Sequence, residues 1–449
     1  MSSTLVIRDV HLAYDDAQNA RKVFDVVLQD GRVARILDAS EREHHGQEDN
    51  GAVKIIDVEG KGLLIPSLCH AHIHLDKCFL LDRCELVKGD FSEALEVTSR
   101  AKAAFSSDTA DMYARGQRLI VESVAAGVTR MRAHVEVDTI VQNACLDAAL
   151  RLKHDYKNCC DVEISLFAQD PLFPSPSSLQ PGDNYTLLEK AATSQHISSI
   201  GSAPYVEPTA SQAKSNIRLI LDLAHAHSLH ADFHLDYTLD ASSEPLIWFL
   251  LSDLRARVRT GRWHAGARVC VGHATRLTLF SPAEWSRYAH EVAEDRLPVT
   301  LAGLPQSDVY MMGRALAPVP RSTLDVVRLA RAHGVGAALA VNNVANAFTP
   351  QGPPDPLALC PLGVALFQAG TKAACAALLR SVTTIARVAT GNASPSSLFP
   401  QVGDVADFVV LHDNPSVQDA ACNPCYDRTT IKNGRVVARR RGHVELHPH

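Results

Sequence analysis

The two ends of the chain share a pattern of short runs rich in Val, Ile and Leu, separated by turn residues. Near the N-terminus these runs occupy residues 4–8, 23–28, 32–37 and 53–58. Asp30-Gly31 lies between the second and third runs and is a hairpin signal, since a tight hairpin turn needs residues that accept positive φ. Near the C-terminus, residues 403–411 and 430–437 repeat the pattern, the latter with Asn433-Gly434 as its turn. We therefore expect one small composite β-sandwich domain, built from residues 1–66 and 400–449.

Between those ends, helical periodicity alternates with short apolar runs, which is typical of repeated βα units and a parallel sheet. The expected strands are at residues 62–68, 128–135, 162–167, 197–203, 229–234, 268–272, 297–302 and 334–341. This pattern predicts an α/β fold in which residues 67–399 form a (β/α)8 TIM-like barrel. The chemistry of such a barrel belongs at the C-terminal ends of its strands.

Composition narrows the class of protein. The chain has 449 residues, 46% of them hydrophobic, and a formal net charge of -6, so it can bury a large core but has no basic field to attract nucleic acid. No apolar run reaches the length of a membrane span, and no signal segment opens the chain. The 11 scattered cysteines fit reduced thiols. We expect a cytoplasmic enzyme with a small-molecule substrate and no nucleic-acid or membrane partner, and a homo-oligomer stays open.

His72 and His74 follow the first expected barrel strand. Side chains two apart in a strand point to the same face, so both imidazoles could bind one ion, and imidazole is a common metal ligand. Asp76 could orient one of the rings. Two hydrogen-bonded loop histidines are the alternative for this pair taken alone.

Polar residues also stand at the ends of other expected strands. They are His134 and Glu136, Gln169, His234 and Asp236, His273, and Asn342 with Asn343. A single histidine at a strand end is more often a hydrogen-bonded core residue than a ligand. Several such ends that meet at one rim together predict a functional site.

The motifs at these ends resemble those of the amidohydrolase superfamily, and within it the cytosine deaminase branch. The matching stretches are His72-Ile-His74-Leu-Asp76, Arg132-Ala-His134-Val-Glu136-Val, Phe167-Ala-Gln169, His234-Leu-Asp236, Gly272-His273 and Met312-Gly-Arg314. The resemblance covers nearly the whole chain, and a composite β-sandwich from both termini is also a family feature.

The resemblance implies a role for each of these side chains. His72, His74 and His234 would bind a metal ion, His273 would polarise the substrate or bound water, and Gln169 would hydrogen-bond an amide-like edge of the substrate. His134, Asn342 and Asn343 are further candidates for substrate binding. No lysine stands at the end of the fourth strand, where two-metal relatives carry a bridging carbamate. We therefore expect one divalent ion, zinc or iron.

Two positions depart from the family pattern. Tyr237 stands where cytosine deaminase has a proton-shuttling Glu, and Asn342 and Asn343 stand where the family has a metal-binding Asp. An amide cannot accept a proton at neutral pH, and a Tyr with a pKa near 10 is a poor base. Asp308 lies where cytosine deaminase has an Asn. It is either a relocated base or only the cap of a turn, and both readings stay open.

We therefore predict a metal-dependent hydrolase that cleaves a C–N bond in a cyclic amide, amidine or N-heterocycle, with free cytosine not its main substrate. One alternative is non-hydrolytic chemistry on the same barrel, with Tyr237 as acid or base. Another is a binding protein that has lost catalysis. Lys77, Arg83 and Lys88 could meet an anionic substrate, although solvated loop charges are the more ordinary expectation for them.

Overall fold

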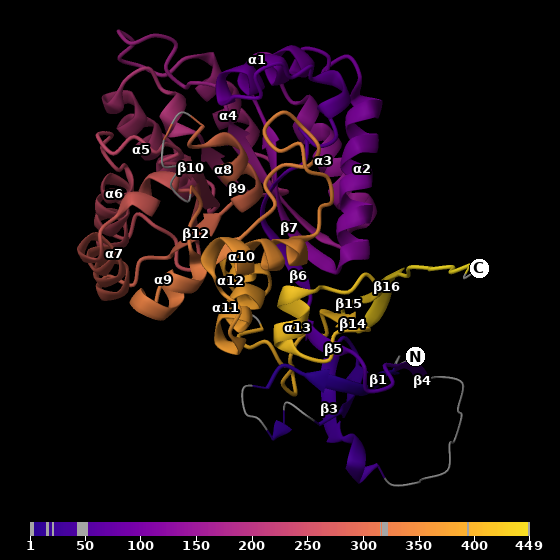
Figure 1. Cartoon of the computed structure of the whole chain (residues 1–449). Coiled ribbons are helices and arrows are strands. Elements are labelled where there is room, and N and C mark those ends of the chain that lie inside the picture. The colour runs from indigo at the N-terminus through magenta and orange to yellow at the C-terminus, as the bar shows by residue number, and fades with distance from the viewer. Residues whose placement is uncertain are drawn as a thin grey trace.

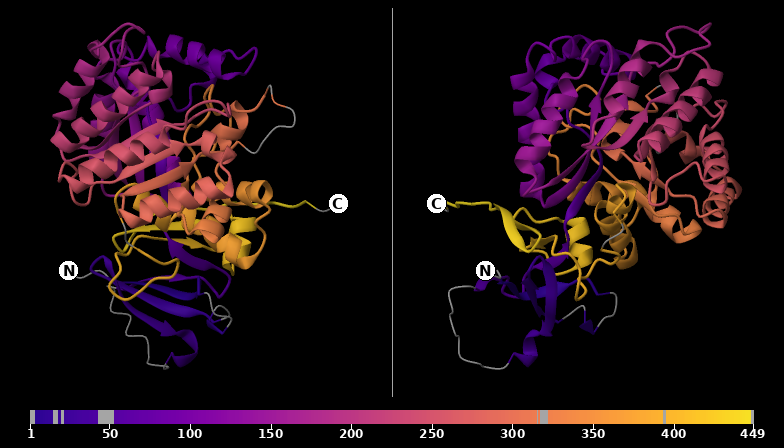
Figure 2. Two further views of the ribbon diagram at one scale, coloured as in Figure 1. Left: turned by 90° about the vertical axis from the view of Figure 1, so that its left-hand side faces the viewer. Right: turned by 180° about the vertical axis from the view of Figure 1, so that it is seen from behind.

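The protein, described here from a computed structural model, consists of two units, each organised around an eight-stranded sheet (Figure 1). The structure describes residues 4–14, 18–19, 22–42, 53–314, 316, 322–392 and 395–447. Figure 2 shows that the N-terminal strands (indigo) and the C-terminal strands (yellow) lie together in the smaller, terminal unit.

The terminal unit is a β domain assembled from both ends of the chain. Its N-terminal strands are β1 (Thr4–Leu12), β2 (Phe24–Gln29), β3 (Arg32–Asp38), β4 (Val53–Asp57) and β5 (Leu63–Pro66), and its C-terminal strands are β14 (Phe408–Leu411), β15 (Arg428–Lys432) and β16 (Arg435–Arg440). The order is β16-β15-β14-β5-β1-β2-β3, with β4 paired to β1. The antiparallel pairing of β14 with β5 joins the two ends, and the domain has its own apolar core.

Both predicted hairpins are confirmed. Asp30 and Gly31 have φ of 51° and 79° between β2 and β3, and Asn433 and Gly434 have φ of 47° and 72° between β15 and β16. These positive angles are the reason why an Asp or Asn followed by Gly occupies each turn.

The larger unit is a barrel of eight strands that pair in chain order. Its strands are β6 (Leu68–His74), β7 (Val128–Glu136), β8 (Asp161–Ala168), β9 (Ile197–Ser202), β10 (His230–Leu235), β11 (Val269–His273), β12 (Val299–Gly303) and β13 (Ala337–Leu339). The pairs are parallel, and Asn342, just after β13, closes the circle against β6, since its N–H donates to His72 O (3.2 Å) and its C=O accepts from His74 N (2.8 Å). The predicted (β/α)8 barrel with a terminal β domain is confirmed.

Helices surround the barrel, each burying an apolar stripe against it. They are α1 (Phe91–Lys102), α2 (Thr109–Ala126), α3 (Ala144–Tyr156), α4 (Asp183–Ala192), α5 (Ala210–Ala226), α6 (Ile247–Arg259), α7 (Pro282–Glu294), α8 (Pro305–Met311), α9 (Val326–His333), α10 (Leu359–Phe367), α11 (Lys372–Val382) and α12 (Thr384–Ala389). The last helix, α13 (Val417–Cys422), packs against α10 and α11. Several begin at a residue that caps free N–H groups, as Ser281 does for α7 in a capping box with Glu284. In the described part of the chain, none of the helices has the length and apolarity needed to cross a membrane.

The first barrel strand is not where the sequence pattern placed it. Residues 62–68 were expected to be that strand, but β5 ends at Pro66 and belongs to the β domain. The chain passes from one sheet to the other at Ser67, whose N–H donates to Asp407 O (3.0 Å). The barrel strand β6 then contains His72 and His74 and is buried throughout. Because inward-facing histidines interrupt its apolar run, the hydrophobic pattern alone did not find it.

Candidate metal centre and active site

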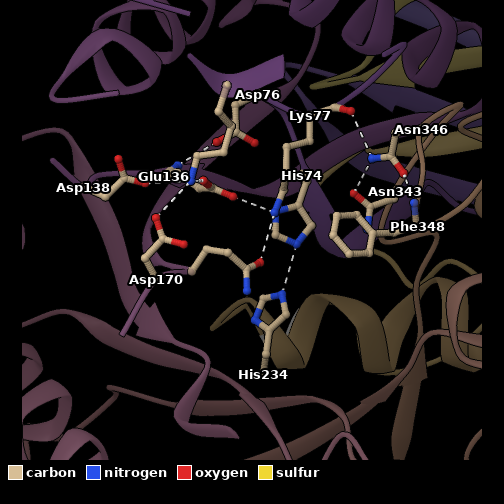
Figure 3. Close-up of polar contacts among 12 residues, drawn as sticks. His74, Asp76, Lys77, Glu136, Asp138, Asp170, His234, Asn343, Asn346 and Phe348 are labelled. Carbon is tan, nitrogen blue, oxygen red and sulfur yellow. Dashed lines mark hydrogen bonds and ion pairs between the residues drawn. The ribbon is translucent and has the colours of Figure 1, made fainter. Parts of the chain in front are cut away.

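Three imidazoles from two strands converge at the C-terminal rim of the barrel. His72 and His74 come from β6 and His234 from β10. Nε2 of His234 lies 3.0 Å from Nε2 of His72 and 3.0 Å from Nε2 of His74. The side chains are at most 2% exposed, so the residues predicted as metal ligands do meet in space (Figure 3 shows His74 and His234).

Burial favours the neutral form of these rings. It lowers the pKa of His74 well below its ordinary value, with Lys77 and the neighbouring rings acting in the same direction, and it also lowers the pKa of His72 and His234. One His234 nitrogen faces two other ring nitrogens, and it cannot form a good hydrogen bond to both. A divalent ion at their centre would satisfy all three lone pairs, so the donor set fits a metal that prefers imidazole.

A second cluster lies against the other edge of His72. Its Nδ1 is 3.1 Å from Nε2 of His134 and 3.6 Å from Oδ1 of Asp232. Arg132 donates to the other carboxylate oxygen of Asp232 at 3.0 Å. Burial opposes ionisation of Asp232, but the His134 and His72 rings and Arg132 lower its pKa to about 2. His134, predicted to bind substrate, lies in this buried cluster and is not among the residues that line the pocket.

A pocket opens over the His74 and His234 rings. It is lined by His74, Lys77, Phe91, Gln169, Tyr205, His234, Tyr237, His273, Asn342, Asn343 and Phe348. The predicted residues Gln169, Tyr237, His273, Asn342 and Asn343 are therefore brought together. None of the described residues that line this pocket is an Asp or a Glu.

His273 is held by Asp308. Its Nδ1 lies 2.7 Å from Oδ1 of Asp308, while Oδ2 of Asp308 accepts from Thr323 Oγ1 (2.8 Å) and Leu304 N (3.0 Å). With Nδ1–H donated to the carboxylate, the Nε2 lone pair of His273 is free to act in the pocket. Asp308 is fully buried and does not line the pocket, so it acts on the pocket through His273.

The two departures from the family pattern have defined environments. Burial, and then the charge of Asp308, raises the pKa of Tyr237 well above its ordinary value, so its phenol keeps its proton. Asn342 has φ of 69°, and its Nδ2 donates to Ser307 Oγ at 2.8 Å. Its Oδ1 is buried and has no hydrogen-bond partner among the described residues. The amide oxygen is therefore available as a neutral acceptor in the pocket.

Lys77 lines the pocket and is buried, so it is not a solvated loop charge. Its Nζ lies 2.6 Å from Glu136 Oε1 and donates to Gln169 Oε1 at 3.2 Å, and the residue is 2% exposed. Lys102 contacts the other oxygen of Glu136 and also Asp138 (2.7 Å) and Asp170 (3.3 Å). Figure 3 labels these three acidic residues beside Lys77. The solvated reading holds for Arg83, an exposed partner of Asp111, but it is wrong for Lys77.

The chain is similar to known proteins over nearly its whole length. It is 22% identical over 440 residues to an N-isopropylammelide isopropyl amidohydrolase of Pseudomonas sp. (strain ADP), covering 97% of this chain and 97% of that protein. It is also 22% identical over 424 residues to a pterin deaminase of Rhizobium rhizogenes, covering 92% of this chain and 88% of the relative. No family model matches the chain.

Solved structures share the fold over a similar extent. A 5-methylcytosine deaminase from Klebsiella pneumoniae superimposes with a TM-score of 0.82 at 22% identity, covering 98% of this chain and 100% of that one. An adenosine deaminase from Xanthomonas campestris with bound zinc gives a TM-score of 0.63 at 16% identity, covering 99% and 95%. In sequence and in fold, this chain is therefore similar over nearly its whole length to amidohydrolases and deaminases. The resemblance drawn from the strand-end motifs is thereby confirmed.

Sequence reasoning missed one part of this site and favoured the wrong environment for another. Asp232 shares a barrel-facing side of β10 with His234, a spacing of two that the sequence displays, yet nothing in the sequence says that it reaches His72. Lys77 was named as a possible contact to an anion, but a solvated loop charge was the favoured expectation, although the apolar residues Leu75, Cys78 and Phe79 around it were a sign of burial.

Proposed function

We propose that this protein is a metal-dependent hydrolase of the amidohydrolase superfamily that breaks a C–N bond of a small cyclic amide, amidine or N-heterocycle. The observation that carries the proposal is the convergence of three neutral imidazoles, His72, His74 and His234, beneath a pocket that also contains His273 held by Asp308. Similar full-length relatives are named for hydrolysis at an ammelide and a pterin, and these names favour hydrolysis over the non-hydrolytic alternative and over a binding protein.

One divalent ion, zinc or iron, would be held by His72, His74 and His234. The chemistry that such an ion would supply is the polarisation of a water molecule, whose pKa it would lower. The Asn342 side chain, which follows β13, presents a neutral amide oxygen to the pocket. This Oδ1 has no hydrogen-bond partner among the described residues. Zinc bound to an adenosine deaminase of the same fold supports the choice of metal.

His273 is the group we assign to proton transfer. Asn342 is an amide, and the raised pKa of Tyr237 keeps its phenol protonated, so neither can accept the proton of the attacking water. Asp308 fixes His273 with its Nε2 toward the pocket, and that nitrogen can accept a proton and later deliver it to the leaving amine. Tyr237, whose ring lies 3.8 Å from that of His273 between centroids, is placed to donate a hydrogen bond.

The remaining lining residues favour a planar heterocycle with polar edges. Lys77 and Gln169 present donors at one side of the pocket, Asn343 lies at another, and Phe91 and Phe348 add apolar surface. Free cytosine is not the main substrate, since its hydrolysis in relatives depends on the Glu that Tyr237 replaces. Amino- or alkylamino-substituted pterins and triazines are the class we favour.

The test is release of ammonia or amine from a panel of heterocycles by the metal-reconstituted protein. The panel contains a pterin, an N-alkylaminotriazine, 5-methylcytosine and cytosine, and His273→Asn is the matched control. We expect release from at least one pterin or triazine, and a loss of ~10²- to 10⁴-fold in the variant. Turnover of cytosine above all others would contradict the substrate class, and no release from any member would contradict the function.

We also propose a cytoplasmic location and no nucleic-acid partner. All 11 cysteines are free thiols, which suits a reducing compartment. The net charge of -6 disfavours binding to phosphate backbones. A homo-oligomer stays a prediction that the size of the purified protein would test.

A further inference from the structure

Both ring nitrogens of His72 face a partner. Nε2 points to the other two candidate ligands, while Nδ1 points to His134 Nε2 (3.1 Å) and Asp232 Oδ1 (3.6 Å). When Nε2 of a neutral imidazole binds a metal, the proton sits on Nδ1 and needs an acceptor. His134 Nε2 and Asp232 Oδ1 are the acceptors present.

Asp232 is fixed in place by the barrel itself. Arg132 donates to its Oδ2 at 3.0 Å and anchors to Ala389 O at 2.9 Å, and Arg132, His134 and Asp232 are all 0% exposed. Oδ1 of Asp232 has no hydrogen-bond partner among the described residues and lies 3.9 Å from His134 Nε2. One carboxylate oxygen is thus held by Arg132 and the other is left for the edge of His72.

The charge of Asp232 matters because the candidate ligands are neutral. Imidazoles bind a metal ion in their neutral form, and the residue after β13 is Asn342, an amide, where the family resembled has a carboxylate. No carboxylate lines the pocket among the described residues. Asp232 therefore places a negative charge beside the Nδ1 edge of His72, a candidate metal ligand.

We propose that Asp232 and His134 are positioning residues for His72, which fix its ring and tautomer and offset the charge of the metal. This inference rests on the proposed metal-dependent function and assigns to two buried residues a role in metal affinity. The spacing of two on β10 explains the arrangement, since one strand supplies both the ligand His234 and the acceptor beneath another ligand.

The same three side chains could instead form a second cation site, because their donor atoms lie within 4.8 Å of one another. Two features oppose that reading. An ion at Nδ1 would require His72 to bridge two metals as an imidazolate, with both protons lost. It would also lie beside the Arg132 guanidinium, a cation already bound to Asp232, and like charges in a buried site repel strongly.

The test measures metal binding to the metal-free full chain. Zinc affinity is obtained by competition with a chromophoric chelator, and the visible spectrum of the cobalt(II) form reports ligand geometry. We expect one ion per chain in the wild type, and in Asp232→Asn an affinity lower by ~10- to 100-fold with an altered cobalt spectrum. The control is Asp25→Asn, the same change at a buried carboxylate on β2 in the terminal β domain, which accepts from Arg42 Nε at 2.8 Å. It is expected to leave zinc affinity unchanged.

His134→Leu removes the other acceptor and carries the test if Asp232→Asn does not fold, which circular dichroism of the metal-free chains would reveal. It is expected to weaken zinc binding by roughly 10-fold. Wild-type affinity and cobalt spectrum in the folded variants would overturn the inference. So would two ions in the wild type and one in Asp232→Asn. A wild type that binds no ion would overturn the proposed function itself.

Discussion

The side chain of His273 is fixed by one buried carboxylate. Asp308 accepts from Nδ1 at 2.7 Å and is itself held by Thr323 and the Leu304 N–H. From the sequence, two hypotheses were open for Asp308: a relocated general base, or the cap of a turn. The structure supports a third role, because the carboxylate reaches the pocket only through His273.

Replacing Asp308 by Asn should lower kcat by about 10²-fold or more, because the amide can present its NH2 to Nδ1 and turn the wrong tautomer toward the substrate. KM should change little, since Asp308 does not line the pocket. Kinetics of Asp308→Asn, His273→Asn and the double variant check this, and the double variant should be no worse than His273→Asn. Additive losses, or rescue of Asp308→Asn by Asn342→Asp, would instead favour the relocated base.

The Lys77–Glu136–Lys102 group predicts a pH dependence of stability. Burial opposes ionisation of Glu136, but Lys102 and Lys77 lower its pKa from 4.5 to about 2. A carboxyl with a lowered folded-state pKa stabilises the fold above its unfolded pKa, and this contribution is lost as the pH falls between those two values. The free energy of unfolding of the metal-free chain should therefore exceed that of Glu136→Gln most at pH 7, and the difference should narrow below about pH 4.5.

Urea unfolding at several pH values measures this difference. The control is Glu96→Gln, since the Glu96 side chain is 69% exposed and its replacement should give a small, constant difference. A constant gap between wild type and Glu136→Gln from pH 7 to pH 3 would show that the charge of Glu136 does not contribute as argued.

At the scale of elements, a glycine on β11 leaves space for the ring of His72, a candidate metal ligand. A Cβ on Gly272 would lie 3.0 Å from both Cε1 and Nδ1 of His72. Gly272→Ala should push the His72 ring aside, weaken zinc binding by about 10-fold and destabilise the fold by about 1–3 kcal/mol. Chelator competition and urea unfolding measure the two effects.

Gly352→Ala is the matched control, because a Cβ there would meet nothing within 4 Å. It should leave both quantities unchanged. Unchanged zinc affinity in Gly272→Ala would mean that the His72 ring is not placed as described.

Element positions were largely predictable where the chemistry agreed with the hydrophobic pattern. Strands β7 to β12 lie close to where they were expected, because runs of Val, Ile, Leu and Ala persist in them around isolated polar residues. The hairpin turns carry Asp-Gly or Asn-Gly. The failure at β5 and β6 has a physical cause. Polar ligands inside a buried strand look like the end of that strand, and Pro66 makes the preceding run look complete.

At the scale of the molecule, a buried arginine joins the β domain to the barrel. Arg428 on β15 donates to Ala126 O and Asp355 Oδ1, both at 2.8 Å, and is 1% exposed. Arg428→Met should lower the free energy of unfolding by about 3 kcal/mol, because it removes the nearest cation from the buried Asp355 and leaves it the Leu357 N–H (3.0 Å) and the more distant Arg440 (3.7 Å). Metal affinity should be unaffected. Arg435→Met in the same hairpin replaces an exposed residue and should cost less than about 0.5 kcal/mol; equal effects of the two variants would contradict this account.

The overall architecture and the three candidate metal ligands could be predicted from the sequence, because motif spacing and strand order determine which rim of the barrel the histidines share. The contacts of Asp308, Asp232 and Lys77 were not, since they depend on distances between elements that only the folded barrel sets. Asp308 and His273, for example, are 35 residues apart and meet only because α8 begins beside the end of β11.

The most direct test of the account is the metal content of the purified, untagged chain, measured by elemental analysis beside His72→Ala/His74→Ala. The account predicts about one zinc or iron ion per wild-type chain after reconstitution, because His72, His74 and His234 form one site, and almost none in the double variant, which keeps only one of the three ligands. No bound metal in the reconstituted wild type, or full occupancy in the double variant, would contradict it.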